Sequence, residues 1–209
     1  MIYYNKKSYK NLQNLLPRKI NILDIGSRGG ADGWLLDIND SLEKTNFDAD
    51  PNLTKDFTAL FNKLEKKNFY FCKDPSQSSF FQPNPIIKDY EDESRRLNYK
   101  IIKDIETVTL DSLNIKKNID LIKIDTQGSE FEIICGALNL IKKNKPLIFL
   151  ETWSHPIYKK VKHFSEIIIE LEKNDDELWG MDDKAAAFRL DVKKHFDKNF
   201  SRRRTAGYN

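Results

Sequence analysis

Short apolar runs alternate along this chain with longer segments whose apolar residues recur at helical spacing, and this alternation constrains the fold more than any other feature. The clearest runs are KINILDIG at 19–26, NIDLIKID at 118–125 and KPLIFLET at 145–152. Each has the length of a buried strand. Strands that alternate with helices predict a mostly parallel sheet with right-handed crossovers, so the fold class is α/β.

The remaining elements fill the intervals between these runs. Helical spacing is found at 31–44, 51–67, 129–143 and 158–174, and further strand patterns at 45–50, 68–73 and 177–182. Residues 74–98 interrupt the alternation with Pro75, Pro83 and Pro85. Such a stretch predicts a long connection, and a lid over a site is one role for it.

Size and composition limit the class of protein. The chain has 209 residues, enough for one domain, and its 39% apolar content argues against disorder as a description of the whole. The first residues lack the apolar core of a signal peptide, and no run approaches the roughly 20 apolar residues of a membrane-spanning helix. We therefore expect a cytoplasmic protein without a membrane span. The two cysteines, Cys72 and Cys135, are expected to be small buried hydrophobes.

Charge is distributed unevenly. The net charge of +3 is too small to indicate a nucleic-acid partner, but residues 183–209 hold eight Lys or Arg against three Asp. We expect one domain over 1–182, beginning with a helical extension at 1–19, followed by a basic extension at 183–209. A solvated, frayed terminus is the simpler explanation of the basic segment than a phosphate or membrane contact.

A glycine-rich turn follows the first predicted strand, in ILDIGSRGGADGW. The carboxyl ends of strands are where open α/β sheets bind ligands. A dinucleotide fingerprint would place glycine at the first, third and sixth positions, but these hold Gly26, Arg28 and Ala31. NAD is therefore disfavoured, and the sequence contains no phosphate-binding P-loop motif.

Acidic residues accompany this turn. Asp24 lies within the apolar run, where an anion is costly unless it meets a donor or a cation such as a ligand amine. Asp48 follows Gly26 by 22 residues, near the spacing at which an acid reaches a ribose hydroxyl. This combination favours an adenosine-type ligand with a positive charge and no pyrophosphate, such as S-adenosylmethionine. The plainer alternative is a tight turn in which Asp24 caps the backbone.

The segment IDLIKIDTQGSEFEIICGA at 119–137, taken with the glycine turn, resembles the signature of the FkbM family of S-adenosylmethionine-dependent methyltransferases. The likeness continues in the same order through four further segments: FDADP at 47–51, DPSQSSFFQPN at 74–84, ETVTLDSLN at 106–114 and IFLETWSHPIY at 148–158. It covers roughly residues 20–180, and the block around residues 121–137 is its most specific part.

The resemblance implies a class I methyltransferase, Rossmann-like fold: seven strands, mostly parallel, with helices on both faces and an antiparallel last strand. It implies S-adenosyl-L-methionine as cofactor, bound by Asp24, Gly26, Gly30 and Asp48, with Ser27 and Arg28 in the same loop. Family members mostly methylate the hydroxyl oxygen of a sugar, a glycan or a secondary metabolite. The expected activity is therefore O-methylation of a small-molecule or glycan acceptor.

Two alternatives stay open beside this interpretation. The first is a non-catalytic, methyltransferase-like binding or scaffold protein. Compared with the family, the chain is short before the 74–84 segment, a region that normally helps to enclose the adenine. The second is another nucleotide-dependent α/β enzyme, against which the failed dinucleotide and P-loop patterns already count.

The predicted catalytic residues are Asp125, Glu151 and His155. Asp125 and Glu151 end neighbouring strands and His155 follows soon after, so all three could meet at one sheet edge. Any of them could take the proton of an acceptor hydroxyl, or together they could hold a divalent cation; we prefer the metal-free arrangement. His155 could equally be an ordinary loop residue. Glu130, in the first turn of the next helix, is expected to act either as a helix cap or in the site.

Overall fold

The computed structural model describes residues 16–28, 34–53, 57–85, 96–152, 157–174, 176 and 178. All of them belong to the first of two compact units, residues 1–178; the second unit is 179–209. Residues 1–15 of the predicted helical extension at 1–19 lie outside the described residues, and residues 16–19 form no helix. Most of the strand predicted at 177–182 and the basic extension at 183–209 also lie outside the described residues. No helix in the described part is long and apolar enough to span a bilayer.

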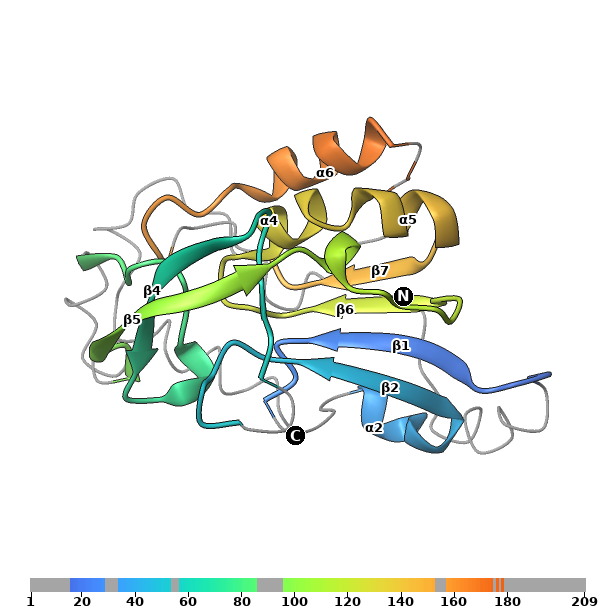
Figure 1. The fold of residues 1–209 in the computed structure, drawn as a ribbon, viewed down its shortest axis with the longest axis horizontal. Coiled ribbons are helices and arrows are strands. Elements are labelled where there is room, and N and C mark those ends of the chain that lie inside the picture. The colour runs from blue at the N-terminus through green and yellow to red at the C-terminus, as the bar shows by residue number, and fades with distance from the viewer. Residues whose placement is uncertain are drawn as a thin grey trace, which may run out of the picture. The chain divides into compact units, whose positions relative to one another are not determined.

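A four-stranded parallel sheet forms the centre of the first unit (Figure 1). Its order is β2 (Leu42–Phe47), β1 (Ile20–Ile25), β6 (Leu121–Ile124) and β7 (Leu147–Leu150). The chain runs outward in one direction from β1 to β2 and in the other from β6 to β7, so the strand order reverses between β1 and β6. The predicted strands at 19–26, 118–125 and 145–152 are confirmed, and so is their parallel arrangement.

Helices cover both faces of this sheet, as the α/β prediction requires. Leu23, Ile25, Ile122 and Ile124 join one core cluster with α4 (Glu130–Cys135), α5 (Leu138–Asn144) and α6 (Phe164–Glu172). Figure 1 shows these three helices together on one side of the sheet. On the opposite face, Ile22, Leu42 and Leu121 pack against Leu35 of α2 (Trp34–Asp37).

The helix predicted at 129–143 is divided into α4 and α5 at Gly136. A Cβ at this position would lie 2.3 Å from the carbonyl oxygen of Phe61, so only glycine allows the chain to approach so closely. The helix predicted at 31–44 is also shorter. It ends at Asp37, a 3₁₀ turn covers Asn39–Ser41, and Leu42 already begins β2, because pairing with β1 outweighs the helical spacing.

The helix predicted at 51–67 is wrong. Its second half instead contributes β3 (Ala59–Leu60) and the start of β4 (Glu65–Cys72). Both pair with β5 (Tyr99–Val108), β3 in parallel and β4 antiparallel, in a separate sheet of order β3-β5-β4. Leu64, which helical spacing would bury, is 76% exposed.

An aromatic cluster explains why the second sheet forms. Phe61 and Phe69 pack against Phe80 with ring centroids 5.8 and 5.2 Å apart, in edge-to-face arrangements. These contacts join β4 to the connection after it and favour the strand over the helix. The predicted strand at 68–73 lies within β4 and is confirmed.

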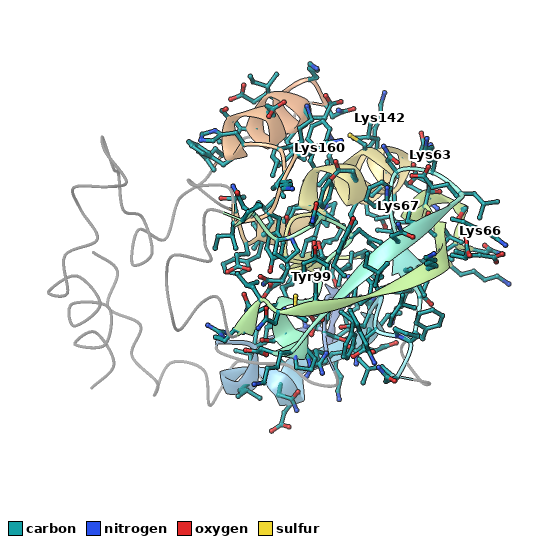
Figure 2. The ribbon with its side chains drawn as sticks, turned by 90° about the vertical axis from the view of Figure 1, so that its left-hand side faces the viewer. Lys63, Lys66, Lys67, Tyr99, Lys142 and Lys160 are labelled. Atoms are coloured by element: carbon teal, nitrogen blue, oxygen red, sulfur yellow. The ribbon has the colours of Figure 1, made fainter. Side chains whose placement is uncertain are left out.

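Lysines of the β3–β4 turn and of β4 are labelled in Figure 2. Lys63 and Lys66 are exposed, whereas Lys67 is half-buried with its Nζ 4.0 Å from the centroid of the Phe61 ring. Lys63 and Lys67 lie 3.1 and 3.3 Å from carboxylate oxygens of Glu65. Lys66 lies 3.7 Å from Glu106 of β5. Acidic side chains therefore accompany these lysines, and their charges do not add into a strong positive field.

Candidate active site

The carboxyl edge of the parallel sheet gathers the predicted site residues that the structure describes. Because the strands are parallel and in register, the segments that follow them meet at one edge. These residues are Asp24, Gly26, Ser27, Arg28, Asp48, Asp125 and Glu151. Gly30 and His155 lie outside the described residues, so their predicted roles stay predictions.

The bend at Gly26 fixes the course of the loop after β1. Gly26 has a φ of +78°, and its N–H donates to the carbonyl of Phe47 at the end of β2 (2.8 Å). A Cβ at this position would lie 1.8 Å from the carbonyl oxygen of Asp125. The loop therefore passes close to the backbone at the ends of β2 and β6, where only a residue without a Cβ fits.

Replacing Gly26 with alanine is expected to lower the free energy of unfolding by at least about 2 kcal/mol, since the loop must leave both strand ends. Urea unfolding followed by circular dichroism measures this change. An alanine variant as stable as the parent chain would show that the loop has another way across the sheet edge.

Arg28, Asp48 and Asp50 form a network beside the bend. The Asp48 carboxylate accepts the backbone N–H groups of Arg28 (2.9 Å) and Asp50 (2.8 Å). The Arg28 guanidinium in turn donates to the buried Asp50 carboxylate at 2.9 Å. Asp48 is therefore held in place with lone pairs remaining for a ligand hydroxyl.

Ser27 supplies a test of whether this loop suits a ligand. Ser27 is only 4% exposed, and its Oγ has no hydrogen-bond partner among the described residues. A buried hydroxyl left in that state costs free energy, which a bound polar group would recover. The loop thus fits a polar ligand at the edge of β1.

Lys123 is a residue of this region that the sequence reasoning missed. Asp24 is completely buried, and its Oδ1 lies 3.2 Å from the Lys123 ammonium group on the neighbouring strand β6. The same nitrogen lies 3.9 Å from Asp125 Oδ2. A lysine inside an apolar strand, two residues before Asp125 and so on the same face, was the available signal.

Asp125 and Glu151 form a close pair of acids. Gln127 Nε2 donates to Asp125 Oδ1 and to Glu151 Oε2, both at 2.9 Å. Burial first, and then the neighbouring charge of Asp125, raise the pKa of Glu151 to about 9. Burial and the neighbouring acid therefore favour the protonated form of Glu151.

The connection after β4 is anchored to the turn that carries Gln127. Ser79 Oγ donates to the Gln127 carbonyl at 2.7 Å, and the fully buried Tyr158 hydroxyl lies 2.9 Å from the Gln77 carbonyl and 3.2 Å from Gln127 Oε1. The described part of the connection thus packs against the site. Residues 86–95 lie outside the described part, and the lid stays a prediction.

Glu130 holds the strand-to-helix turn. Its Oε1 accepts the N–H groups of Thr126 (2.9 Å) and Gly128 (3.1 Å) and the Thr126 hydroxyl (3.1 Å). The residue is 2% exposed, and burial raises its pKa. Of the two roles expected from the sequence, these contacts match the capping one. Within the described residues, no three His, Cys, Asp or Glu side chains gather as a metal-ligand group.

Comparison with known proteins identifies the family. Residues 24–179 match the model of the methyltransferase FkbM domain, from Asp24 in β1 to a point beyond the end of α6. No curated protein and no solved structure matched the chain. The matched range covers well over half of the sequence and includes all the predicted site residues. The chain therefore belongs to the FkbM methyltransferase family.

Proposed function

We propose that this chain is an S-adenosylmethionine-dependent methyltransferase acting on a hydroxyl oxygen of a sugar, a glycan or a secondary metabolite. Membership of the methyltransferase family supports the reaction class. The observation that carries the proposal is the meeting of Asp24, the Gly26 bend and Asp48 at one sheet edge, beside the Asp125–Glu151 pair. The choice of a hydroxyl oxygen as the methyl acceptor rests on the family resemblance.

The charges at this edge suit a cationic cofactor. Lys123 lies within ion-pair distance of both Asp24 and Asp125, so one positive charge faces two carboxylates. Asp48 adds a further carboxylate to this edge of the sheet. A sulfonium and an ammonium group would be attracted to it. Asp48 and Ser27 would bind the polar groups of the nucleoside.

When bound, the cofactor supplies an electrophilic methyl group. We assign Asp125 as the base that takes the proton of the acceptor hydroxyl, because it ends β6 at the centre of the edge and its side chain is 31% exposed. Glu151 lies beside Asp125 and shares with it the amide of Gln127, which helps to orient the Asp125 carboxylate. Placing acceptor and donor within reacting distance accounts for much of the remaining acceleration.

A metal-free transfer is favoured by the position of Gln127. Its amide nitrogen donates to an oxygen of each acid at 2.9 Å, so the two carboxyl groups already share a neutral partner. His155, which lies outside the described residues, remains a second candidate for the proton acceptor.

Methyl transfer can be tested directly with the full chain and S-adenosylmethionine labelled with ¹³C in the methyl group. We expect release of S-adenosylhomocysteine that depends on a hydroxyl-bearing acceptor, with the product methyl identified as oxygen-bound by its ¹³C chemical shift. Cofactor binding without turnover on any saccharide or hydroxylated metabolite would instead favour the binding or scaffold alternative.

Replacing Asp48 with alanine is expected to weaken binding of S-adenosylhomocysteine by about 30-fold or more, the effect of losing a charged hydrogen-bond acceptor for two hydroxyls. Isothermal titration calorimetry measures the affinity, with the exposed Asp40→Ala as control. An analogue lacking the ribose hydroxyls should bind the parent chain weakly and lose nothing further in the variant. An additional loss with that analogue would contradict the ribose assignment.

A further inference from the structure

We propose that Gln127 is a positioning residue of the methyl-transfer site: its side-chain amide holds the carboxyl groups of Asp125 and Glu151 together by donating a hydrogen bond to each. This inference rests on the proposed function, since it takes Asp125 to be the base.

The contacts of the amide nitrogen carry the inference. Gln127 Nε2 lies 2.9 Å from an oxygen of Asp125, at the end of β6, and 2.9 Å from an oxygen of Glu151, at the end of β7. An uncharged amide with two N–H donors is the side chain that can serve two carboxyl groups at once without adding charge. It stabilises negative charge on either of them.

The backbone at Gln127 is held in an uncommon conformation to place this amide. Its φ is +59°, a region that non-glycine residues rarely adopt, and the residue is 8% exposed. The cost of such a conformation is met by the surrounding contacts, and strain of this kind clusters at functional sites. Ser79 fixes the peptide by donating to the Gln127 carbonyl at 2.7 Å.

The other end of the side chain sets the orientation of the amide. Oε1 faces the hydroxyl of Tyr158 at 3.2 Å, and Tyr158 is fully buried. With the oxygen directed to this hydroxyl, the N–H groups must point to the two acids. Tyr158 and Ser79 thus fix the position of Gln127, and through it the hydrogen bonds that the two carboxyl groups receive.

The charged groups around Glu151 come from several elements. They are Asp125 directly after β6, Glu130 of α4 and the hydroxyl of Tyr158. Burial and the Asp125 charge raise the pKa of Glu151, whereas the bond from Gln127 lowers it. Loss of the amide should therefore move the titration of Glu151 to higher pH.

The experiment is a ¹³C NMR titration of the Glu151 carboxyl in the ligand-free full chain, with the signal assigned through Glu151→Gln. The midpoint of the parent chain should lie well above the usual range of a glutamate carboxyl group, because Glu151 is buried beside Asp125. Gln127→Met keeps the side-chain length but donates no hydrogen bond, and should raise the midpoint by about one pH unit. Gln82→Met, the same change on the connection where the side chain meets Tyr99 and Lys159, should leave the midpoint unchanged.

An equal or lower midpoint in Gln127→Met would overturn the inference. If that variant does not fold, Tyr158→Phe decides: it frees the amide to rotate and should shift the midpoint in the same direction by a smaller amount, and an unchanged midpoint overturns the inference. The titration needs no cofactor, so a shifted midpoint without methyl transfer would reject only the proposed function. Methyl transfer with unshifted midpoints would reject only the role of Gln127.

Discussion

Replacing Asp125 with asparagine is expected to lower the kcat of methyl transfer by about 100-fold or more, the usual contribution of a general base. Asparagine has nearly the same size, and its carbonyl oxygen can still accept the N–H of Gln127 that now reaches Asp125 Oδ1 at 2.9 Å. The substitution therefore removes the basic oxygen and leaves the turn intact. Initial rates of S-adenosylhomocysteine release measure the loss.

The affinity for the cofactor product separates catalysis from binding in this variant. Because Asp125 is assigned to the acceptor end, the Kd for S-adenosylhomocysteine should stay within about threefold of the parent value. Asp104→Asn, an exposed aspartate of β5, serves as the matched control and should retain full activity. Full turnover in Asp125→Asn would remove Asp125 from the mechanism and direct attention to Glu151 and His155.

Replacing Lys123 with methionine is expected to destabilise the chain by about 3 kcal/mol, because it removes the ammonium group that forms an ion pair with the buried Asp24 carboxylate. Asp24 is 0% exposed and lies 3.2 Å from the Lys123 nitrogen. A loss of this size is a large part of the roughly 5–15 kcal/mol that holds a domain folded. Urea unfolding followed by circular dichroism gives the difference.

The double variant Asp24→Asn with Lys123→Met tests the reason for that loss. It removes both charges from the interior, so most of the stability should return. Asp24→Asn alone leaves Lys123 with the more distant Asp125, at 3.9 Å. Its free energy of unfolding should lie between those of Lys123→Met and the double variant. A double variant as unstable as Lys123→Met would mean that packing of the lysine stem, rather than its charge, holds the sheet together.

The parallel sheet and its functional edge could be predicted from the sequence because their signals are local. The apolar runs that became β1, β6 and β7 have strand length, and Gly26, Asp125 and Glu151 follow them directly. Once strands are parallel, residues after their carboxyl ends must lie near one another. No long-range information is needed for that step.

The region after β2 could not be predicted in the same way. Apolar residues from Leu53 to Leu64 recur at helical spacing, but Ala59 and Leu60 pair with β5, which lies more than forty residues later in the chain. Short apolar segments are compatible with either helix or strand, and the choice was made by the aromatic cluster around Phe80.

The partners of the site acids also depend on contacts that sequence spacing does not show. Lys123 meets Asp24 only because β1 and β6 are neighbours in this register. Gln127 stands inside the family motif, yet its two carboxyl partners and the Tyr158 hydroxyl come from different elements. The sequence indicated the acidic residues of the site, but not that Lys123 and Gln127 contact them.

The central claim is that Asp24, the Gly26 bend and Asp48 form one binding site for S-adenosylmethionine, and calorimetric titration of the full chain with this nucleoside tests it most directly. We predict saturable binding at one site per chain with a Kd in the micromolar range, about −8 kcal/mol, and no comparable heat with NAD or ATP. No binding at millimolar S-adenosylmethionine, or tighter binding of NAD or ATP, would contradict the claim.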